Sequence, residues 1–167
     1  AATTQHMRVG SGGVMLPNHA PLVVAEQFAL LESLHPGRVD VGIGRAPGSD
    51  QRTAMALRRS RDLLGADDFP RDLLDLMGLL GDPRGEHGLW QHFHATPAAS
   101  SVPQVFLLGS SGYSAQLAAH LGLPFGFAHH FDMGGTLEAA ERYRREFRPS
   151  ASFSEPYLII TANVLAG

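Results

Sequence analysis

The chain has 167 residues, a formal net charge of −3 and no cysteine. This length predicts a single domain with a sizeable apolar core, and the slight negative charge argues against a nucleic-acid surface. Disulfide and thiol chemistry are excluded because cysteine is absent. The first residues show no secretory pattern, and no apolar run approaches the roughly 20 residues of a membrane helix. We therefore expect a cytoplasmic protein with no membrane contact.

The first third of the chain is expected to form a strand, a helix and a second strand. Residues 8–10 are the first strand, which ends at the run Ser11-Gly12-Gly13. Residues 21–34 begin with a proline, which suits a first helical turn, and the run His35-Pro36-Gly37 stops the helix. Residues 39–43 are nearly all apolar, which is typical of a strand buried on both faces. This βαβ unit predicts a parallel strand pair.

The remaining sequence continues the alternation of helices and strands. Helical patterns cover residues 49–66, 70–80, 113–121 and 134–147, and strand patterns cover residues 102–108, 124–128 and 157–164. The fold class is therefore α/β, with about five parallel strands and intervening helices in one domain, residues 1–167. An open sheet of this kind leaves apolar strand edges exposed. We expect a homo-oligomer, or a further chain segment, to cover them.

Two helices carry patterns that predict their buried faces. Leu73, Leu76, Met77 and Leu80 are spaced at i, i+3, i+4 and i+7, so one face of the helix over residues 70–80 is expected to be buried. In the last helix, the expected buried row is Leu137, Ala140 and Phe147, completed by Tyr143 or Arg144. Residues 49–66 are interpreted as an exposed surface helix, with a mobile loop over a ligand as the alternative. Glu26 and Arg38 are expected to form a structural ion pair.

The run Gly109-Ser110-Ser111-Gly112 joins an expected strand to an expected helix. The N-terminus of a helix offers unpaired N–H groups and partial positive charge, which attract phosphate. Small residues allow a phosphate to approach, and the two hydroxyl groups can donate hydrogen bonds to it. The alternative interpretation is an ordinary helix cap, because Ser is a favoured N-cap residue.

Two further candidate ligand-binding positions follow expected strands. Arg45 comes directly after the second strand and can present a planar fork of donors to an anion. The alternative for Arg45 is a surface ion pair. Ser11 and Gly12 are also expected at the carboxyl end of a strand, where backbone with small or no side chains would fit against a flat ring. The alternative is a tight turn with no ligand.

Histidines gather in two places. His129 and His130 end the fourth strand, where a histidine can act as a base or hydrogen-bond a bound group, although a structural role is the alternative. The segment over residues 84–101 is polar and contains His87, His92 and His94. We expect no metal there, because suitable further ligands are lacking. A loop of this length is a functional lid or a poorly ordered segment.

Several of these runs together resemble the luciferase-like flavin monooxygenases, the family of bacterial luciferase. The similarity covers about residues 8–164 and is carried by the runs GSGGVMLPNH, AEQ, LHPGR and GIGRAPGSD, followed in the same order by LLGSSGYSAQLAAHLGLPFGFAHHF. Members of this family are (β/α)8 barrels that bind reduced flavin at the carboxyl ends of the strands. A complete barrel needs roughly 250 residues, so the resemblance implies a partial TIM barrel that is incomplete at both ends.

The resemblance also implies a cofactor and the residues that hold it. The cofactor would be reduced FMN, or a deazaflavin as in a sister branch. Its phosphate would lie against Ser110, Ser111, Ser114 and Arg45, with the backbone of Ser11, Gly12, Gly44, Gly109 and Gly112 alongside. The family's Glu-His-His motif on the second strand has no counterpart in this sequence, which puts catalysis by this chain alone in doubt.

The function expected from these features is a flavin-dependent monooxygenase that uses reduced FMN and dioxygen on a small organic substrate, with His129 or His130 as catalytic candidates. A flavin reductase is an expected partner. Two alternatives stay open. One is a non-catalytic flavin-binding relative, and the other is a barrel enzyme that acts on a phosphorylated small molecule.

Overall fold

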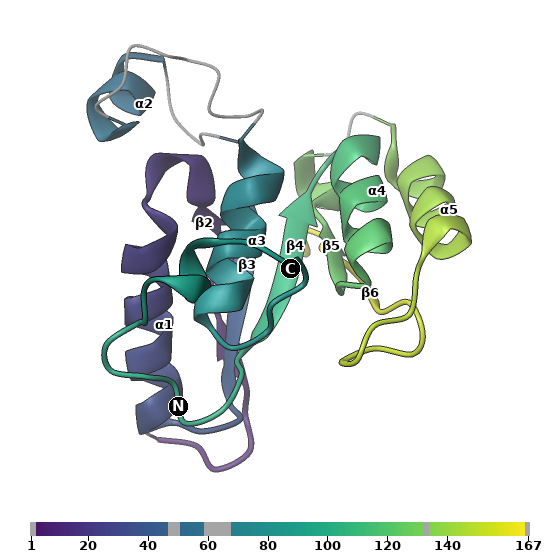
Figure 1. Cartoon of the computed structure of the whole chain (residues 1–167). Helices are drawn as coiled ribbons and strands as arrows, with labels where there is room; N and C mark the ends of the chain where they lie inside the picture. The colour runs from purple at the N-terminus through teal and green to yellow at the C-terminus, as the bar shows by residue number, and fades with distance from the viewer. Residues whose placement is uncertain (1–2, 47–50, 59–67, 132–133, 166–167) are drawn as a thin grey trace. The chain divides into compact units, whose positions relative to one another are not determined.

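The structure, a computed structural model, describes residues 3–46, 51–58, 68–131 and 134–165. The chain divides into two compact units, Ala1–Val105 and Phe106–Gly167, and each is described by itself (Figure 1). Helices and strands alternate in both units, as the sequence predicts.

The first unit contains short parallel strands covered by helices. Its elements are β1 (Val9–Gly10), β2 (Val14–Met15), the 3-10 helix η1 (Leu16–Asn18), α1 (Pro21–Leu34), β3 (Val39–Gly44), α2 (Gln51–Arg58), α3 (Phe69–Leu79), the 3-10 helix η2 (Leu89–Gln91) and the first residues of β4 (Gln104–Gly109). Both β1 and β2 pair with β3 in parallel. The expected helix over residues 49–66 is described only at α2, and the rest of it lies outside the described residues.

β1 and β2 are two pieces of one strand, separated by a bulge. Gly10 pairs with Asp40, and Val14 pairs with Ile43, so four steps along this strand match three along β3. The Ser11 hydroxyl bridges the interruption, since it donates to Gly42 O and accepts from Gly42 N, both at 2.9 Å. The strand therefore breaks at Ser11 as expected, but it resumes as β2, which was not expected, and reaches its carboxyl end at Met15.

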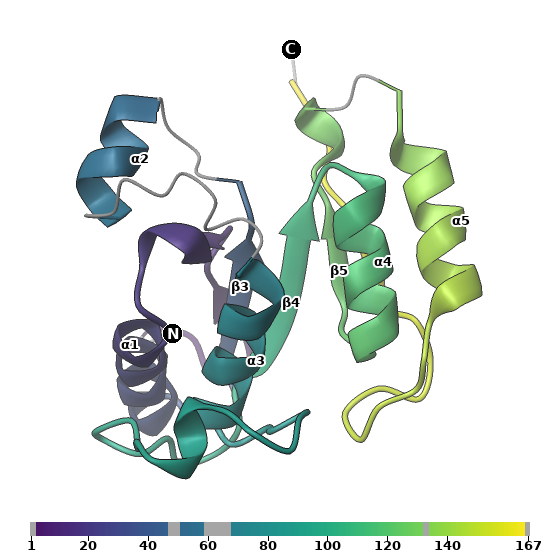
Figure 2. The ribbon, with the colours of Figure 1, turned by 45° about the horizontal axis from the view of Figure 1, so that its top comes forward.

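The predicted buried face of α3 is confirmed. Leu73, Leu76 and Met77 are fully buried, and Leu80 is 3% exposed. Burying each such side chain stabilises the fold by about 1.5–3 kcal/mol. The helix lies near α1 within this unit, and Figure 2 shows the two helices from a second direction.

The ion pair expected between Glu26 and Arg38 is wrong. Glu26 instead accepts a hydrogen bond from Thr96 N at 3.2 Å, and Arg38 donates to Met7 O and Thr4 Oγ1. The fully buried carboxylate of α1 is Glu32, whose Oε1 accepts from Gly37 N at 2.6 Å and from the Ser101 hydroxyl. Sequence spacing could not identify these partners, because all of them lie outside the helices and strands.

The second unit contains three parallel strands and two packed helices. It comprises the rest of β4, α4 (Gly112–Leu121), β5 (Phe125–Phe127), the 3-10 helix η3 (His129–Phe131), α5 (Thr136–Glu146) and β6 (Leu158–Ile160). β5 pairs in parallel with β4 on one side and with β6 on the other. Gly122 ends α4 in the left-handed conformation, with φ of 60°, as expected for a glycine cap.

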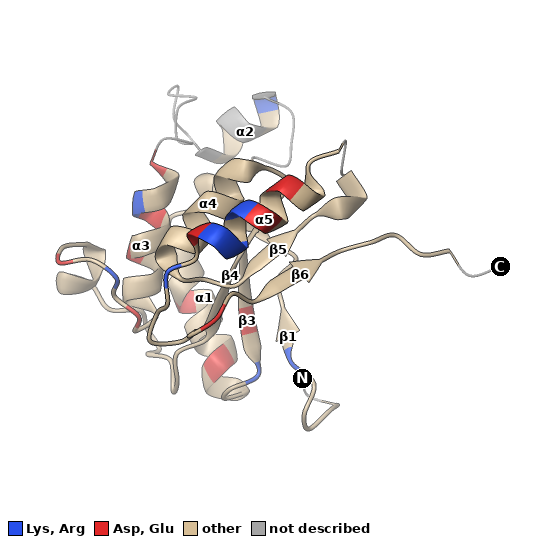
Figure 3. Cartoon of the chain, turned by 90° about the vertical axis from the view of Figure 1, so that its right-hand side faces the viewer, with Lys and Arg blue, Asp and Glu red and all other residues tan. Residues whose placement is uncertain are grey.

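α5 packs lengthwise along α4 (Figures 1 and 2). Its buried row consists of Thr136, Ala139, Ala140 and Tyr143. The expectation that Leu137 is buried is wrong, since its side chain is 77% exposed. Among the charged residues of α5, Glu138 lies near the start of the helix and Arg144 and Arg145 lie near its end, an arrangement that the helix dipole favours (Figure 3).

The Tyr143 hydroxyl ties α5 to the strands of the second unit. It donates to Leu123 O at 2.8 Å and accepts from Tyr157 N at 3.1 Å, just before β5 and β6 begin. Burial raises the pKa of Tyr143 from 10.0 to about 12. The hydrogen bond to Tyr157 N fixes the residue that precedes β6. The strand expected over residues 157–164 is shorter in the structure, Leu158–Ile160.

Counting β1 and β2 as one interrupted strand, the described residues form five parallel strands with helices between them. No helix in this part of the chain is long and apolar enough to cross a membrane.

Candidate functional site

The carboxyl ends of the strands in the second unit lie at one level. Gly109 pairs with Phe127, and Phe127 pairs with Ile160, so β4, β5 and β6 end together. The pairing continues one step further, because Thr161 N donates to Phe127 O at 3.0 Å. The structure therefore brings the serine turn after β4 and the histidines after β5 to the same edge.

The N-terminus of α4 has no side-chain cap. Ser111 stands at the N-cap position with extended dihedral angles, φ −140° and ψ 159°, but its hydroxyl makes no capping hydrogen bond. Ser110 and Ser111 are both exposed, and neither hydroxyl has a hydrogen-bond partner among the described residues. The first N–H groups of α4 have no partner within the helix. This turn thus presents backbone and hydroxyl donors to the edge where the strands end.

Gly109 and Ser114 have a different role in the same turn. A Cβ atom on Gly109 would overlap the side chain of Ser114, so only glycine lets the first turn of α4 approach the end of β4 this closely. Ser114 is buried, whereas Ser110 and Ser111 are exposed. Ser114 therefore supports the shape of the turn from behind.

Arg142 of α5 is a further candidate site residue, which no sequence pattern indicated. Its Nη1 lies 3.4 Å from the position that a Cβ on Gly112 would occupy, at the first residue of α4. Its ion-pair contacts, with Glu138 and Glu146, are long, at 3.9 and 4.0 Å. A guanidinium group at this end of α4 adds positive charge to that of the helix dipole. Only the packing of α5 on α4 reveals it, since the two segments are about thirty residues apart in the sequence.

The histidines after β5 are each held by one threonine. His129 Nδ1 lies 2.7 Å from Thr136 Oγ1, at the start of α5. His130 Nδ1 lies 2.7 Å from Thr161 Oγ1, just past the end of β6. The His130 ring also packs on Phe131, with 4.0 Å between the ring centroids. Each imidazole is therefore fixed through Nδ1, and both histidines are exposed.

In the first unit, Gly44 and Arg45 lie at the carboxyl end of β3. Gly44 pairs with Met15, and Arg45 follows as a half-buried residue. The candidates Ser11 and Gly12 lie earlier on the neighbouring strand, at the bulge opposite Gly42. The structure therefore separates them along the strand from the Gly44 end, whereas the sequence placed both pairs at strand ends.

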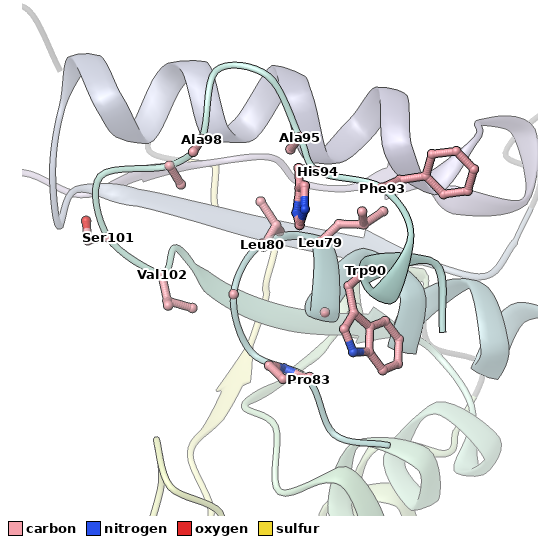
Figure 4. Close-up of a pocket in the computed structure, with 13 residues that line it drawn as sticks. Leu79, Leu80, Pro83, Trp90, Phe93, His94, Ala95, Ala98, Ser101 and Val102 are labelled. Atoms are coloured by element: carbon pink, nitrogen blue, oxygen red, sulfur yellow. The ribbon is translucent and has the colours of Figure 1, made fainter. Parts of the chain in front are cut away.

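The first unit also has a cavity of about 420 Å³ where the chain enters β4 (Figure 4). It is lined by the end of α3, by Trp90, Phe93 and His94 of the polar segment, and by Val102, which follows that segment. Trp90 packs on Gly78, where any Cβ would overlap its ring. None of the candidate flavin-binding residues lines this cavity. Among the described residues, no three His, Asp or Glu side chains are grouped to hold a metal.

The family model described as luciferase-like monooxygenase matches residues 1–167. A luciferase-like monooxygenase of Escherichia coli K12 is 52% identical over 168 residues, which cover 99% of this chain and 48% of the relative. The N-acetyl-S-alkylcysteine monooxygenase of Bacillus subtilis is 37% identical over 147 residues, which cover 88% of this chain and 43% of the relative. The chain belongs to the luciferase-like monooxygenase family and spans about half the length of these relatives.

Solved structures share the fold of this chain. The crystal structure of apo-MsnO8 matches with 40% identity and a TM-score of 0.82, covering 95% of this chain and 45% of that one. The FMN complex of the oxygenating constituent of 3,6-diketocamphane monooxygenase from Pseudomonas putida shares the fold at 18% identity and a TM-score of 0.65, covering 91% and 48%. An F420-dependent secondary alcohol dehydrogenase shares the fold at 16% identity and a TM-score of 0.66, and the match covers 94% of this chain and 50% of the dehydrogenase. The expected fold, a partial (β/α)8 barrel, is confirmed.

Proposed function

We propose that this chain is the phosphate-binding part of a flavin-dependent monooxygenase that uses reduced FMN and dioxygen on a small organic substrate. The observation that carries the proposal is the uncapped N-terminus of α4, with the exposed Ser110 and Ser111 hydroxyls at the level where three strands end. The family membership supports the reaction class, and the named activity of the Bacillus subtilis relative is a monooxygenation.

The residues at the N-terminus of α4 fit a dianionic phosphate. Two hydroxyl groups and the N–H groups at the start of the helix supply donors, and no acidic side chain belongs to the turn itself. Arg142 and the helix dipole supply positive charge. Arg45, after β3, is proposed as a second cation for the same phosphate. Ser11, Gly12, Gly44, Gly109 and Gly112 are proposed as the backbone that accommodates the cofactor.

The protein's part in the reaction is to bind, orient and shield the flavin. When bound, the reduced flavin supplies the chemistry with dioxygen. Holding the phosphate at α4 fixes one end of the cofactor and leaves the other end along the strand ends, where His129 and His130 lie. We propose FMN rather than a deazaflavin, with reduced FMN delivered by a flavin reductase and the strand edges covered by a second copy or by further chain.

One alternative rests on the same observation. A helix N-terminus with two free serine hydroxyls would serve equally for a phosphorylated small molecule without a flavin ring. A non-catalytic flavin-binding protein would also use it. Binding measurements with matched ligands separate these functions.

The test compares FMN with riboflavin, which lacks the phosphate. We expect saturable FMN binding, followed by quenching of flavin fluorescence, and at least tenfold weaker binding of riboflavin. Three variants should each weaken FMN binding, because each loses a charge-assisted hydrogen bond or a nearby cation: Ser111→Ala, Arg45→Ala and Arg142→Ala. The expected loss of binding free energy is about 1.5–3 kcal/mol, or ten- to a hundredfold in affinity.

Matched controls keep the comparison specific. Arg144→Ala removes an exposed cation from the same helix as Arg142, and Ser152→Ala removes an exposed hydroxyl far along the chain from α4. Both should bind FMN as the unmodified chain does. Equal affinities for FMN and riboflavin would reject the phosphate site, and tight binding of inorganic phosphate without flavin binding would favour the alternative.

A further inference from the structure

The ring of His130 is held by a hydrogen-bond chain that runs back into the sheet. His130 Nδ1 lies 2.7 Å from Thr161 Oγ1, and Thr161 Oγ1 lies 3.2 Å from Phe127 O. The backbone N–H of Thr161 donates to the same carbonyl at 3.0 Å. Thr161 is therefore fixed on the last rung of the β5–β6 pairing, and it holds the imidazole through one nitrogen.

The direction of this chain depends on where the single proton of the Thr161 hydroxyl lies. A carbonyl oxygen can only accept, so in the 3.2 Å contact with Phe127 O the hydroxyl is the donor. With the proton in that contact, the 2.7 Å bond between Thr161 and His130 is donated by Nδ1–H of the histidine. In the neutral ring the other nitrogen, Nε2, then has no proton and is an acceptor. A hydroxyl turned toward the ring would instead donate to Nδ1, and the two arrangements differ in the tautomer of His130.

We propose that Thr161 is a positioning residue that holds neutral His130 as the Nδ1–H tautomer, so that Nε2 accepts a hydrogen bond from an N–H or O–H group of the ligand. His130 is exposed and follows the carboxyl end of β5, and no partner for Nε2 occurs among the described residues. The tautomer of His130 is independent of the proposed function. The identification of the ligand as the flavin rests on the proposed function.

The neighbouring histidine offers an internal comparison. His129 Nδ1 lies at the same 2.7 Å distance from a threonine hydroxyl, that of Thr136. Thr136 is buried at the start of α5 and belongs to a different element from Thr161. A change at Thr136 should therefore alter the ring of His129 and leave that of His130 as it was.

The tautomer can be measured by nitrogen-15 NMR of the histidine rings in the free chain, with His130→Gln to assign the resonances. We expect His130 to show a protonated Nδ1 and an unprotonated Nε2. Thr161→Val keeps the shape of the side chain but removes the acceptor, and should shift His130 to mainly Nε2–H, the form that an unconstrained neutral imidazole favours. Thr161→Ser should retain the Nδ1–H form, and Thr136→Val should not change His130.

Two results in the free chain would overturn the proposal. One is a mainly Nε2–H tautomer in the unmodified chain, which needs no variant to fold. The other is an unchanged His130 tautomer in Thr161→Val. Neither depends on flavin binding, so failure here is distinct from failure of the proposed function.

The ligand-facing role of Nε2 is tested with FMN, whose ring N–H and ribityl hydroxyls are donors. Saturating FMN should move the Nε2 resonance of His130 upfield, as a new hydrogen bond to that nitrogen does, and leave Nδ1 nearly unchanged. FMN that binds without moving the Nε2 resonance overturns that role. If FMN does not bind at all, the proposed function fails, and the NMR measurements on the free chain alone decide whether the tautomer is correct.

Discussion

Replacing Tyr143 by Phe isolates one hydroxyl group that joins α5 to two strands. The phenol is completely buried, and its oxygen donates to Leu123 O at 2.8 Å and accepts from Tyr157 N at 3.1 Å. Phe keeps the ring and its packing but removes both bonds. The substitution takes the buried donor away from Leu123 O and the acceptor away from Tyr157 N, whose bond is part-buried.

Leaving buried polar groups unsatisfied costs about 1–3 kcal/mol, and we expect the free energy of unfolding at pH 7 to fall by this amount. For a chain of this size, each kcal/mol lowers the midpoint of thermal unfolding by roughly 2–4 °C. Unfolding should be followed by circular dichroism, because the single tryptophan lies in the other unit. Tyr157→Phe is the matched control, since its side chain is 51% exposed and should change stability little.

The same hydroxyl predicts a pH dependence. Burial raises the pKa of Tyr143 to about 12 in the folded chain, against 10.0 for an exposed tyrosine. The unfolded chain therefore loses this proton first as the pH rises, and the stability provided by the neutral phenol is lost between about pH 10 and pH 12. The difference corresponds to roughly 2–3 kcal/mol. Tyr143→Phe should lack this part of the alkaline decline.

Equal stability of Tyr143→Phe and Tyr157→Phe at pH 7, with identical alkaline profiles, would refute the reasoning. It would mean that the hydroxyl neither satisfies Leu123 O and Tyr157 N nor resists ionisation in the folded chain.

Three further predictions concern glycines and activity. Gly122→Ala should destabilise the chain by more than about 1 kcal/mol in chemical denaturation, because φ is 60° and a Cβ would stand 2.5 Å from Arg148 O. Gly135→Ala is the control, since a Cβ there meets no neighbour and should leave stability nearly unchanged. Gly78→Ala should displace Trp90, shift its fluorescence emission and lower stability, and unshifted emission would contradict the packing. The 167-residue chain alone should turn over little substrate with reduced FMN, and product formation at a rate typical of longer relatives would refute this.

The elements that sequence patterns predicted well are those governed by local rules. α1 begins at Pro21 and ends at Leu34, and the apolar face of α3 is buried as its spacing indicates. The turn after β4 and the glycine cap at Gly122 also lie where expected. In each case the residues that determine the element lie within or beside it, so a single segment contains enough information.

The features that were missed depend on contacts between distant segments. The strand after Gly10 resumes as β2 because the Ser11 hydroxyl replaces backbone bonds to Gly42, which no local pattern shows. Leu137 was assigned to a buried face that the packing of α5 on α4 leaves exposed. Arg142 reaches the start of α4 through the same packing. The partner of His130 lies thirty-one residues further along the chain.

The central claim is that the N-terminus of α4 binds the phosphate of FMN. Amide nitrogen–proton correlation spectra of the labelled chain, recorded while FMN is added, test it most directly. We expect the largest saturable shifts on the N–H groups of Ser111, Gly112 and Tyr113, and we expect that riboflavin does not reproduce them. Saturable FMN binding that leaves these N–H groups unmoved, with shifts elsewhere in the chain, would contradict it.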